Sequence, residues 1–307
     1  MKTVAVVAHN KKTIGGGLPE LRAALADAGV IKPLWHEIAR SAQAPKRINK
    51  CIRQGADLVI VWGGDGTLQR CIDALAKADA GAKVSLAIVP AGTANLLAVN
   101  LGIPLDVRKA VDIALGGHER GLDVGCINGE HFAVMAGTGF DALMIRDANK
   151  KLKESIGRAA YVWTGFKNLR NKATQAKVSV DGKLWFKGRA SCVLLGNVGT
   201  ILGGIKAFPD AEPNNGRLEV GVVQAESGWE WAKVLARTAV GGAAQSPLVE
   251  TGRGRKIRIK LSQKRPYQLD GGDRPPAKRF RIKAMPHKIT VCVPAQAEPS
   301  APSKSAE

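Results

Sequence analysis

Two mostly apolar runs, each closed by a turn of small residues, constrain the fold of this 307-residue chain more than any other feature. The run Leu58–Trp62 leads into Gly63-Gly64-Asp65-Gly66-Thr67, and the run Val84–Val89 leads into Pro90–Asn95. Such runs are typical of strands in a parallel sheet that is covered on both faces. Helix-like segments follow both turns, from about residue 68 to 78 and from about residue 95. The pattern predicts successive β-α units of an open, doubly wound sheet.

The residues before the first run extend this alternation. Residues 3–8 are expected to form a buried strand, and residues 18–28 and 45–54 to form helices with apolar side chains at helical spacing. A chain of this length holds about two domains. We therefore expect residues 1–120 to form an N-terminal doubly wound α/β domain.

The pattern changes near residue 120, where short strands alternate with Gly and Asn turns. The expected strands are 122–127, 131–136, 177–180, 184–186, 190–196, 217–224, 256–261, 266–269, 279–284 and 288–293. Helices are expected at about 152–170 and 228–239. Residues 121–294 are therefore predicted to form a β-sandwich-like domain, and the Pro-, Ala- and Ser-rich residues 295–307 a disordered tail.

The composition of the two turns suits a phosphate ligand. Glycines let the backbone approach a ligand without a Cβ clash, and free N–H groups at a helix start favour anions. Asp65 could hold a metal ion, and Thr67 could hydrogen-bond phosphate oxygens. Turns that follow successive strands meet at the carboxyl edge of the sheet, where open α/β sheets bind ligands. Neither turn has the sequence of a Walker A loop or of a dinucleotide-binding GxGxxG motif.

The paired motifs, GGDGT at Gly63–Thr67 and PAGTANLLA at Pro90–Ala98, resemble those of the diacylglycerol kinase catalytic-domain family, which includes bacterial lipid kinases and sphingosine kinases. Later segments follow the order of the same family, so that the resemblance spans residues 3–294. These segments are Leu122–Gly125, Phe132, Gly137–Ala142, Gly203-Gly204, Phe208–Ala211, Asn215–Leu218 and Leu269–Gly272.

The resemblance implies an ATP- and Mg²⁺-dependent kinase, with ATP in the cleft between the α/β domain and the β-sandwich. The implied acceptor is the hydroxyl of a diacylglycerol-like or sphingoid lipid. The nucleotide-binding residues implied by similarity are Asn10, Gly63, Gly64, Asp65, Gly66, Thr67 and Thr93. Phosphoryl transfer requires mostly positioning and neutralisation of charge, which glycine-rich turns and a metal ion supply.

The resemblance also implies metal ligands. Asp123 matches an aspartate of a metal–water network, and Glu212, Asn215 and Arg217 match a structural metal site, two of these through backbone carbonyls. Asn215 stands where the family usually has aspartate, and an amide holds Mg²⁺ less well than a carboxylate does.

The general base of the family is a glutamate, and Gly272 stands in its place. Two carboxylates flank this position, Asp270 and Asp273, and we expect Asp273 to supply the base. Together with Asp65, they are the candidate catalytic residues.

A strong positive charge predicts an anionic partner. The chain has 46 Lys and Arg against 26 Asp and Glu, a net charge of +20. Residues 251–288 hold 13 of these basic residues and only two acids, a net +11, and residues 146–172 add more, interleaved with aromatic residues. Such segments favour docking on an anionic membrane surface. Nucleic acid is not expected as a specific partner, because no nucleic-acid-binding motif is present.

The five cysteines are scattered without metal-ligand spacing, which indicates reduced thiols and a cytoplasmic protein. The five histidines are isolated in the sequence, so surface or packing roles are expected for them. No transmembrane segment is expected, so membrane association would be peripheral. The sequence leaves open whether the chain forms a homodimer.

Two alternative functions stay open as well. One is a kinase of the same superfold that acts on a soluble acceptor, as in NAD kinase, which shares GGDGT. The other is a non-catalytic module that binds nucleotide or anionic lipid, a reading favoured by Gly272 and Asn215.

Overall fold

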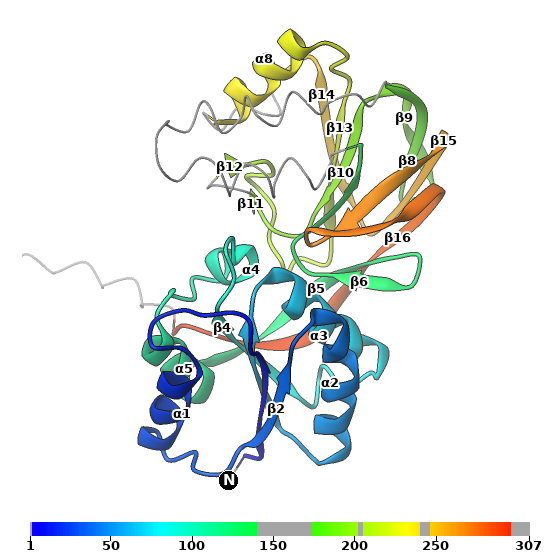
Figure 1. Ribbon diagram of the computed structural model, residues 1–307. Helices are drawn as coiled ribbons and strands as arrows, with labels where there is room; N and C mark the ends of the chain where they lie inside the picture. The colour runs from blue at the N-terminus through cyan, green and yellow to red at the C-terminus, as the bar shows by residue number, and fades with distance from the viewer. Residues whose placement is uncertain (1, 140–172, 202–204, 240–245, 296–307) are drawn as a thin grey trace, which may run out of the picture.

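The computed structural model describes residues 2–139, 173–201, 205–239 and 246–295. Figure 1 shows an α/β unit below a β-rich unit. Four parallel strands form the lower sheet in the order β4-β3-β1-β2. These strands are β1 (Val4–His9), β2 (Leu34–Ile38), β3 (Leu58–Gly63) and β4 (Ser85–Pro90). Every residue of β1, β3 and β4 is buried, as their apolar sequences require.

Helices cover both faces of this sheet, which gives the doubly wound arrangement. α1 (Gly17–Asp27) packs against α5 (Val107–Gly116) on one side, and α2 (Ala44–Arg53) packs against α3 (Asp65–Lys77) on the other (Figure 1). The short segments η1 (Ser41–Gln43) and α4 (Leu96–Asn100) complete the unit.

The upper unit is built from antiparallel strands that continue the same sheet in the order β14-β13-β10-β7-β15-β16. β8 pairs with β15 and carries β9 on its other side, and β5 pairs with β16 and carries β6. The strands are β5 (His118–Ile127), β6 (Glu130–Phe132), β7 (Met135–Thr138), β8 (Thr174–Val180), β9 (Lys183–Ala190), β10 (Cys192–Gly196), β13 (Leu218–Val223), β14 (Val249–Gly254), β15 (Lys256–Leu269) and β16 (Gly272–Val293). A separate pair, β11 (Thr200–Ile201) and β12 (Ile205–Lys206), and the helix α8 (Gly228–Ala239) lie beside them. The expected α/β domain followed by a β-sandwich-like domain is confirmed.

The long strand β16 joins the two units. Its first part pairs with β15, its middle and end pair with β5, and Val291 near its end pairs in parallel with Leu86 of β4. One apolar core therefore runs from the lower sheet into the upper unit, where it includes Met135, Leu194 and Trp231. A second core, with Val178, Val220 and Phe280 among its members, fills the sandwich.

Several boundaries differ from those expected from the sequence. The expected strand pairs 256–261 and 266–269, and 279–284 and 288–293, are each one continuous strand with register shifts inside it. α3 begins at Asp65, within the glycine turn, rather than at residue 68. The expected helix 152–170 lies outside the described residues, as does the expected tail apart from residue 295.

Candidate functional site

The two small-residue turns lie in contact at the carboxyl edge of the parallel sheet. Gly63 at the end of β3 pairs with Pro90 at the end of β4, and the backbone N–H of Ala91 donates to the carbonyl of Gly63 at 2.9 Å. A Cβ on Gly64 would lie 2.9 Å from the Cα of Gly92, and one on Gly92 would collide with Gly64. Only glycine fits at both positions, so the expectation that the turns lie side by side is confirmed.

Asn95 closes the second turn and Asp65 ties it to the first. The side chain of Asn95 accepts a hydrogen bond from the N–H of Gly92 at 2.8 Å and donates one to the Gly92 carbonyl at 3.0 Å. Asn95 has φ +49°, a conformation that asparagine tolerates better than most residues. The carboxylate of Asp65 accepts from the N–H of Leu97 at 3.3 Å. Burial raises the pKa of Asp65, and backbone N–H groups around Leu97 partly offset this effect.

The other residues expected to bind nucleotide occupy different environments. Gly66 and Thr93 are exposed within the two turns. Thr67 is buried, and its hydroxyl lies 2.9 Å from the hydroxyl of Ser41. Asn10 is exposed directly after β1, at the same edge of the sheet. The strand order therefore brings the loop after β1 and both glycine turns to one edge of the sheet. Thr67 is the exception among these residues, because its side chain is buried inside the protein.

Asp270 brings a carboxylate from the upper unit toward this edge. It forms, with Gly271, the two-residue turn between β15 and β16, where both residues have positive φ. Its carboxylate accepts hydrogen bonds from the N–H groups of Ala133, Val134 and Met135 at 2.8, 2.9 and 2.8 Å.

Burial raises the pKa of Asp270 to about 7, although the three backbone N–H groups oppose this shift. The nearby charge of Asp65 raises that pKa further. The two carboxylates are thus close enough to interact, although they come from different units of the molecule.

Asp273, the expected base, is exposed on β16, where it pairs across the hairpin with Gln268. The charge of Asp65 therefore acts on the buried Asp270, whereas Asp273 faces solvent. The role of Asp273 as a base stays a prediction.

The buried carboxylate of Asp123 holds two loops in place, one at Gly216 and one at His287. It is fully buried, and its two oxygens accept from the N–H groups of His287 at 2.8 Å and Gly216 at 2.5 Å. The side chain of Asn215 is also engaged, because it accepts from the N–H of Arg217 at 2.9 Å. No group of three or more His, Cys, Asp or Glu side chains in the described ranges is arranged to hold a metal ion. The side chains of Asp123 and Asn215 thus organise these loops through backbone N–H groups, and the metal-binding role of Asp123, Glu212, Asn215 and Arg217 stays a prediction.

The comparisons with known proteins agree with this geometry. Residues 7–127 match the diacylglycerol kinase catalytic domain, and residues 134–293 match the YegS C-terminal NAD kinase beta sandwich-like domain. A diacylglycerol kinase of Bacillus subtilis is 30% identical over 217 residues, which cover 70% of this chain and 71% of that protein. The chain belongs to the diacylglycerol kinase catalytic-domain family.

Other members of this family of lipid kinases match over more of the chain. A protein of Pseudomonas aeruginosa named as a probable lipid kinase, YegS-like, is 29% identical over 299 residues, which cover 95% of this chain and 94% of that protein. A solved diacylglycerol kinase structure from Bacillus anthracis has a TM-score of 0.74 at 21% identity, and covers 95% of this chain and 97% of its own. An NAD kinase from Archaeoglobus fulgidus in complex with ATP shares the fold more distantly, with a TM-score of 0.54 at 13% identity and coverage of 94% and 92%.

Sequence reasoning missed two buried amides of this kinase. Asn197 donates to the carbonyls of Asp123 and Ala133, at 2.7 and 2.9 Å, and so joins β5 to the bend between β6 and β7. Gln268 is 1% exposed, and its side-chain nitrogen and oxygen have no hydrogen-bond partner among the described residues. The only signal for Gln268 in the sequence is its position two residues before Asp270.

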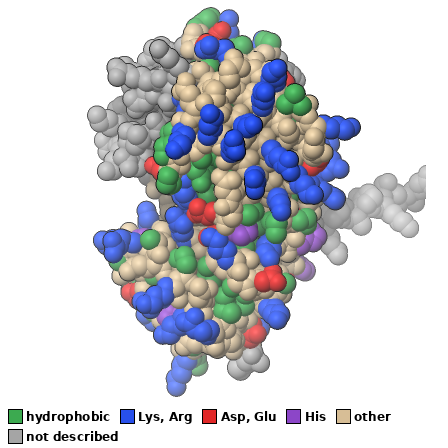
Figure 2. Space-filling model, turned by 90° about the vertical axis from the view of Figure 1, so that its right-hand side faces the viewer, with side chains coloured by type: hydrophobic (Ala, Val, Ile, Leu, Met, Phe, Trp, Pro, Cys, Tyr) green, Lys and Arg blue, Asp and Glu red, His purple; other side chains and the backbone are tan. Residues whose placement is uncertain are grey.

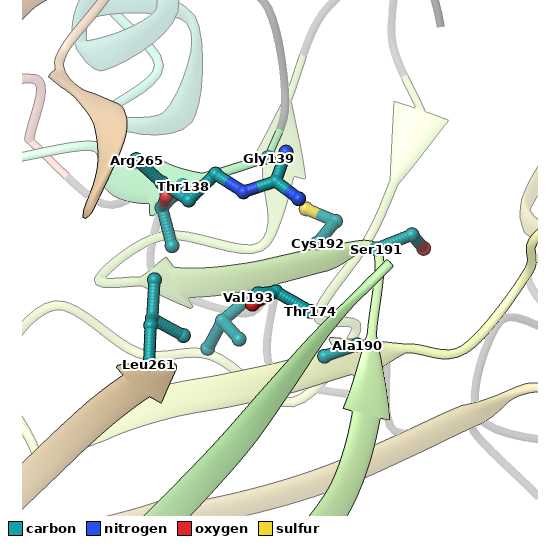
Figure 3. A pocket seen from close by; sticks show the side chains of 9 residues that line it. All are labelled: Thr138, Gly139, Thr174, Ala190, Ser191, Cys192, Val193, Leu261 and Arg265. Atoms are coloured by element: carbon teal, nitrogen blue, oxygen red, sulfur yellow. The ribbon is translucent and has the colours of Figure 1, made fainter. Parts of the chain in front are cut away.

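A small pocket of the kinase lies in the sandwich, away from the paired turns (Figure 3). It is bounded by apolar side chains such as Val193 and Leu261 and by the guanidinium of Arg265. Gly139, the last described residue before the gap at 140–172, also lines it. No helix in the described ranges of the chain is long and apolar enough to cross a membrane.

Proposed function

We propose that this kinase transfers the γ-phosphoryl group of ATP to the hydroxyl of a diacylglycerol-like or sphingoid lipid, with Mg²⁺ as its metal ion. The observation that carries this proposal is the contact between two glycine turns, one of which holds Asp65, whose charge acts on the buried Asp270 of the upper unit. Membership in the family supports the reaction class.

The paired turns are suited to a triphosphate. Gly64 and Gly92 leave backbone without side chains at the carboxyl edge of the sheet, where a phosphate can approach closely. The N-terminus of α3 adds unpaired N–H groups and a partial positive charge. Exposed Gly66 and Thr93 offer further contacts from both turns, and Asn10 offers one from the loop after β1.

The carboxylate of Asp65 is the side chain that fits a Mg²⁺ ion bound together with ATP. The charge of such an ion would offset the repulsion between Asp65 and Asp270 without a bond to Asp270. Mg²⁺ in phosphoryl-transfer sites is commonly bound by one or two carboxylates and by substrate phosphates, so a larger set of side chains is not required. The ion would neutralise charge on the phosphates.

Asp270 is also placed to accept the proton of the acceptor hydroxyl. Its Oδ1 receives the N–H groups of Val134 and Met135, whereas Oδ2 receives only that of Ala133. Oδ2 therefore retains a lone pair for the proton that the acceptor oxygen loses when it attacks phosphorus. A pKa of about 7 suits a general base at neutral pH.

A transfer assay tests this proposal. The purified protein is incubated with Mg²⁺ and γ-labelled ATP, and with diacylglycerol, sphingosine or NAD as the acceptor. We expect label in the lipid only when ATP and Mg²⁺ are both present. Label in NAD alone would favour the soluble-acceptor kinase, and thermal stabilisation by ATP without transfer to any acceptor would favour the non-catalytic module.

We further propose that one face of the upper unit docks on an anionic membrane. Figure 2 shows Lys and Arg side chains spread over this face. The exposed basic residues that the strand pairing places on this face are Lys177 on β8, Lys187 on β9, Lys256, Arg258 and Lys260 on β15, and Arg279, Arg281 and Lys283 on β16. We call this set the basic face.

Like charges stand directly opposite one another on the basic face. Arg258 pairs across the strands with Arg281, and Lys260 pairs with Arg279 on one side and with Lys177 on the other. Such pairs repel, so the free protein gains nothing from their arrangement. Anionic headgroups would relieve the repulsion. Leu184 on the neighbouring edge strand is 59% exposed, which favours lipid over nucleic acid.

Vesicle sedimentation tests the basic face. The variant Arg258→Gln/Lys260→Gln/Arg281→Gln removes three of its charges, and each is worth about 1 kcal/mol near an anionic surface, so binding to phosphatidylglycerol vesicles should weaken about 100-fold. The control variant Lys46→Gln/Lys50→Gln/Arg53→Gln removes three exposed charges from α2 and should bind as the wild type does. Equal loss in both variants, or no binding to these vesicles at low salt, would reject the docking face.

A further inference from the structure

A cysteine, a histidine and an aspartate meet at the hairpin between β5 and β6, outside the paired turns. Cys126 and His131 are direct partners across this antiparallel pair, and the two-residue turn Asn128-Gly129 fixes their register. The imidazole of His131, directly across the pair, lowers the pKa of the Cys126 thiol. Its Nδ1 lies 3.0 Å from Oδ1 of Asp73 on α3.

Asp73 is held so that it orients the imidazole. Its Oδ1 also accepts the backbone N–H of His131 at 2.9 Å, and its Oδ2 accepts from the ammonium of Lys77 at 2.8 Å. Both Asp73 and His131 are buried. A nucleophile, a base within reach of it and a carboxylate that orients the base form the arrangement that activates cysteines in enzymes.

Electrostatics at the cluster favour the ion pair of thiolate and imidazolium. Asp73 and Cys126 raise the pKa of His131 to about 9 against the effect of burial. His131 lowers the pKa of Cys126, whereas burial and the charge of Asp73 oppose this. Lys283, the partner of Cys126 on β16, is a second basic residue next to Cys126.

The other four cysteines differ from Cys126 in access and in charge. Cys51, Cys71, Cys192 and Cys292 are buried, whereas Cys126 is partly exposed. Burial raises the pKa of each of the four buried thiols. They are therefore internal references against which the reactivity of Cys126 can be measured.

We propose that Cys126, His131 and Asp73 form a modification site at which Cys126 forms mixed disulfides with small anionic disulfides. The Cys126 thiolate attacks one sulfur of the disulfide, and a new S–S bond forms as the original one breaks. The leaving sulfur departs with the bonding electron pair as a thiolate and takes the proton that His131 received from Cys126. The disulfide is the sole oxidant, and the positive charge of Lys283 and of the neighbouring basic face favours a disulfide that carries carboxylates.

The probes are 5,5′-dithiobis(2-nitrobenzoate), which is an anionic disulfide, and its uncharged analogue 2,2′-dithiodipyridine. In the folded protein we expect one fast-reacting thiol, which peptide mass spectrometry places at Cys126. Its apparent pKa in the rate profile should lie below that of a free cysteine, about 8.5. The anionic probe should lose its advantage over the uncharged one in Lys283→Gln.

Three variants separate the roles within the cluster. Cys126→Ser should abolish the fast phase, and His131→Gln should slow it about 10-fold at neutral pH because less thiolate is present. Cys51→Ser should leave it unchanged. If His131→Gln does not fold, the rate profile of the wild-type protein decides alone. A profile with an apparent pKa at or above that of free cysteine, or labelling of another thiol first, overturns the proposal.

Discussion

The carboxylate of Asp270 is held by three consecutive backbone N–H groups, those of Ala133, Val134 and Met135. This fixes its position without using a charged partner, so that it can carry a proton or a negative charge near neutral pH. Asp273, three residues away, is exposed and has no such support. The two residues therefore differ in environment although both are aspartates close to Gly272.

We predict that Asp270→Asn lowers kcat about 100-fold to 10,000-fold, the usual range for loss of a general base. Asp270 must be ionised to accept a proton, so kcat/KM of the wild-type enzyme should rise with pH through about 7 and then level off. Turnover and melting temperature of the purified variant are measured together. Asp273→Asn serves as the comparison and should retain turnover, and if only Asp273→Asn is inactive, the sequence-based choice of base is right.

Some functional residues could be predicted from the sequence and others could not. The glycines at 63, 64 and 92 could be found, because a turn after an apolar strand leaves a local pattern. The contact of His131 with Asp73 could not, because the two residues are 58 positions apart and meet only when α3 packs on β6. An isolated histidine in the sequence carries no sign of its partner.

At the level of elements, the site depends on two turns that must touch. Gly64 and Gly92 face each other with no space for a Cβ, whereas a Cβ on Gly66 would meet nothing within 4 Å. Gly66 also lies inside α3, where alanine is a better helix former than glycine. Packing therefore requires glycine at positions 64 and 92, whereas the fold places no such requirement on position 66.

We predict that Gly92→Ala destabilises the protein by about 1–3 kcal/mol, because it forces backbone atoms apart in a packed region. Gly66→Ala should leave stability unchanged or raise it by about 0.5–1 kcal/mol, as in other helices. Urea unfolding measures both. If a phosphate binds at the backbone of residue 66, the added Cβ of Gly66→Ala should keep that phosphate away. Calorimetry should then show weaker ATP binding without loss of stability. Equal stability of Gly92→Ala and wild type would contradict the contact between the turns.

Elements with a strong local pattern were predicted best. β3, β4 and α2 agree with expectation because apolar runs and helical spacing mark them. β2 and α5 were not predicted, and β2 is only partly buried at the edge of the sheet. For β15 and for β16 the sequence predicts two short strands in place of one long strand. Polar and proline-containing stretches interrupt the alternation of apolar residues there, and these stretches coincide with the register shifts.

At the scale of the whole molecule, the core is continuous across the two units. Residues of the lower sheet, such as Val61, share one buried cluster with Met135 and Trp231 of the upper unit. The fully buried Ile289 on β16 belongs to the same cluster. The two family domains matched along the chain are therefore joined by packing as well as by backbone.

We predict a single unfolding transition, because neither unit can lose its structure without exposing core of the other. Calorimetry should give one peak, and fluorescence and circular dichroism should report the same midpoint. Ile289→Ala should lower the free energy of unfolding by about 2–5 kcal/mol, as for other large-to-small core substitutions, and should shift both signals together. Two separated transitions would show that the units are independent.

Since β16 belongs to both units, the kinase has no simple linker about which one half could swing away from the other. A change in the relative position of the two units would bend or twist this shared strand. Its register shift between Met285 and Ile289 is the natural place for such a twist. Making β16 more rigid at this register shift should therefore slow substrate entry and product release. It should leave the chemical step at the glycine turns unchanged.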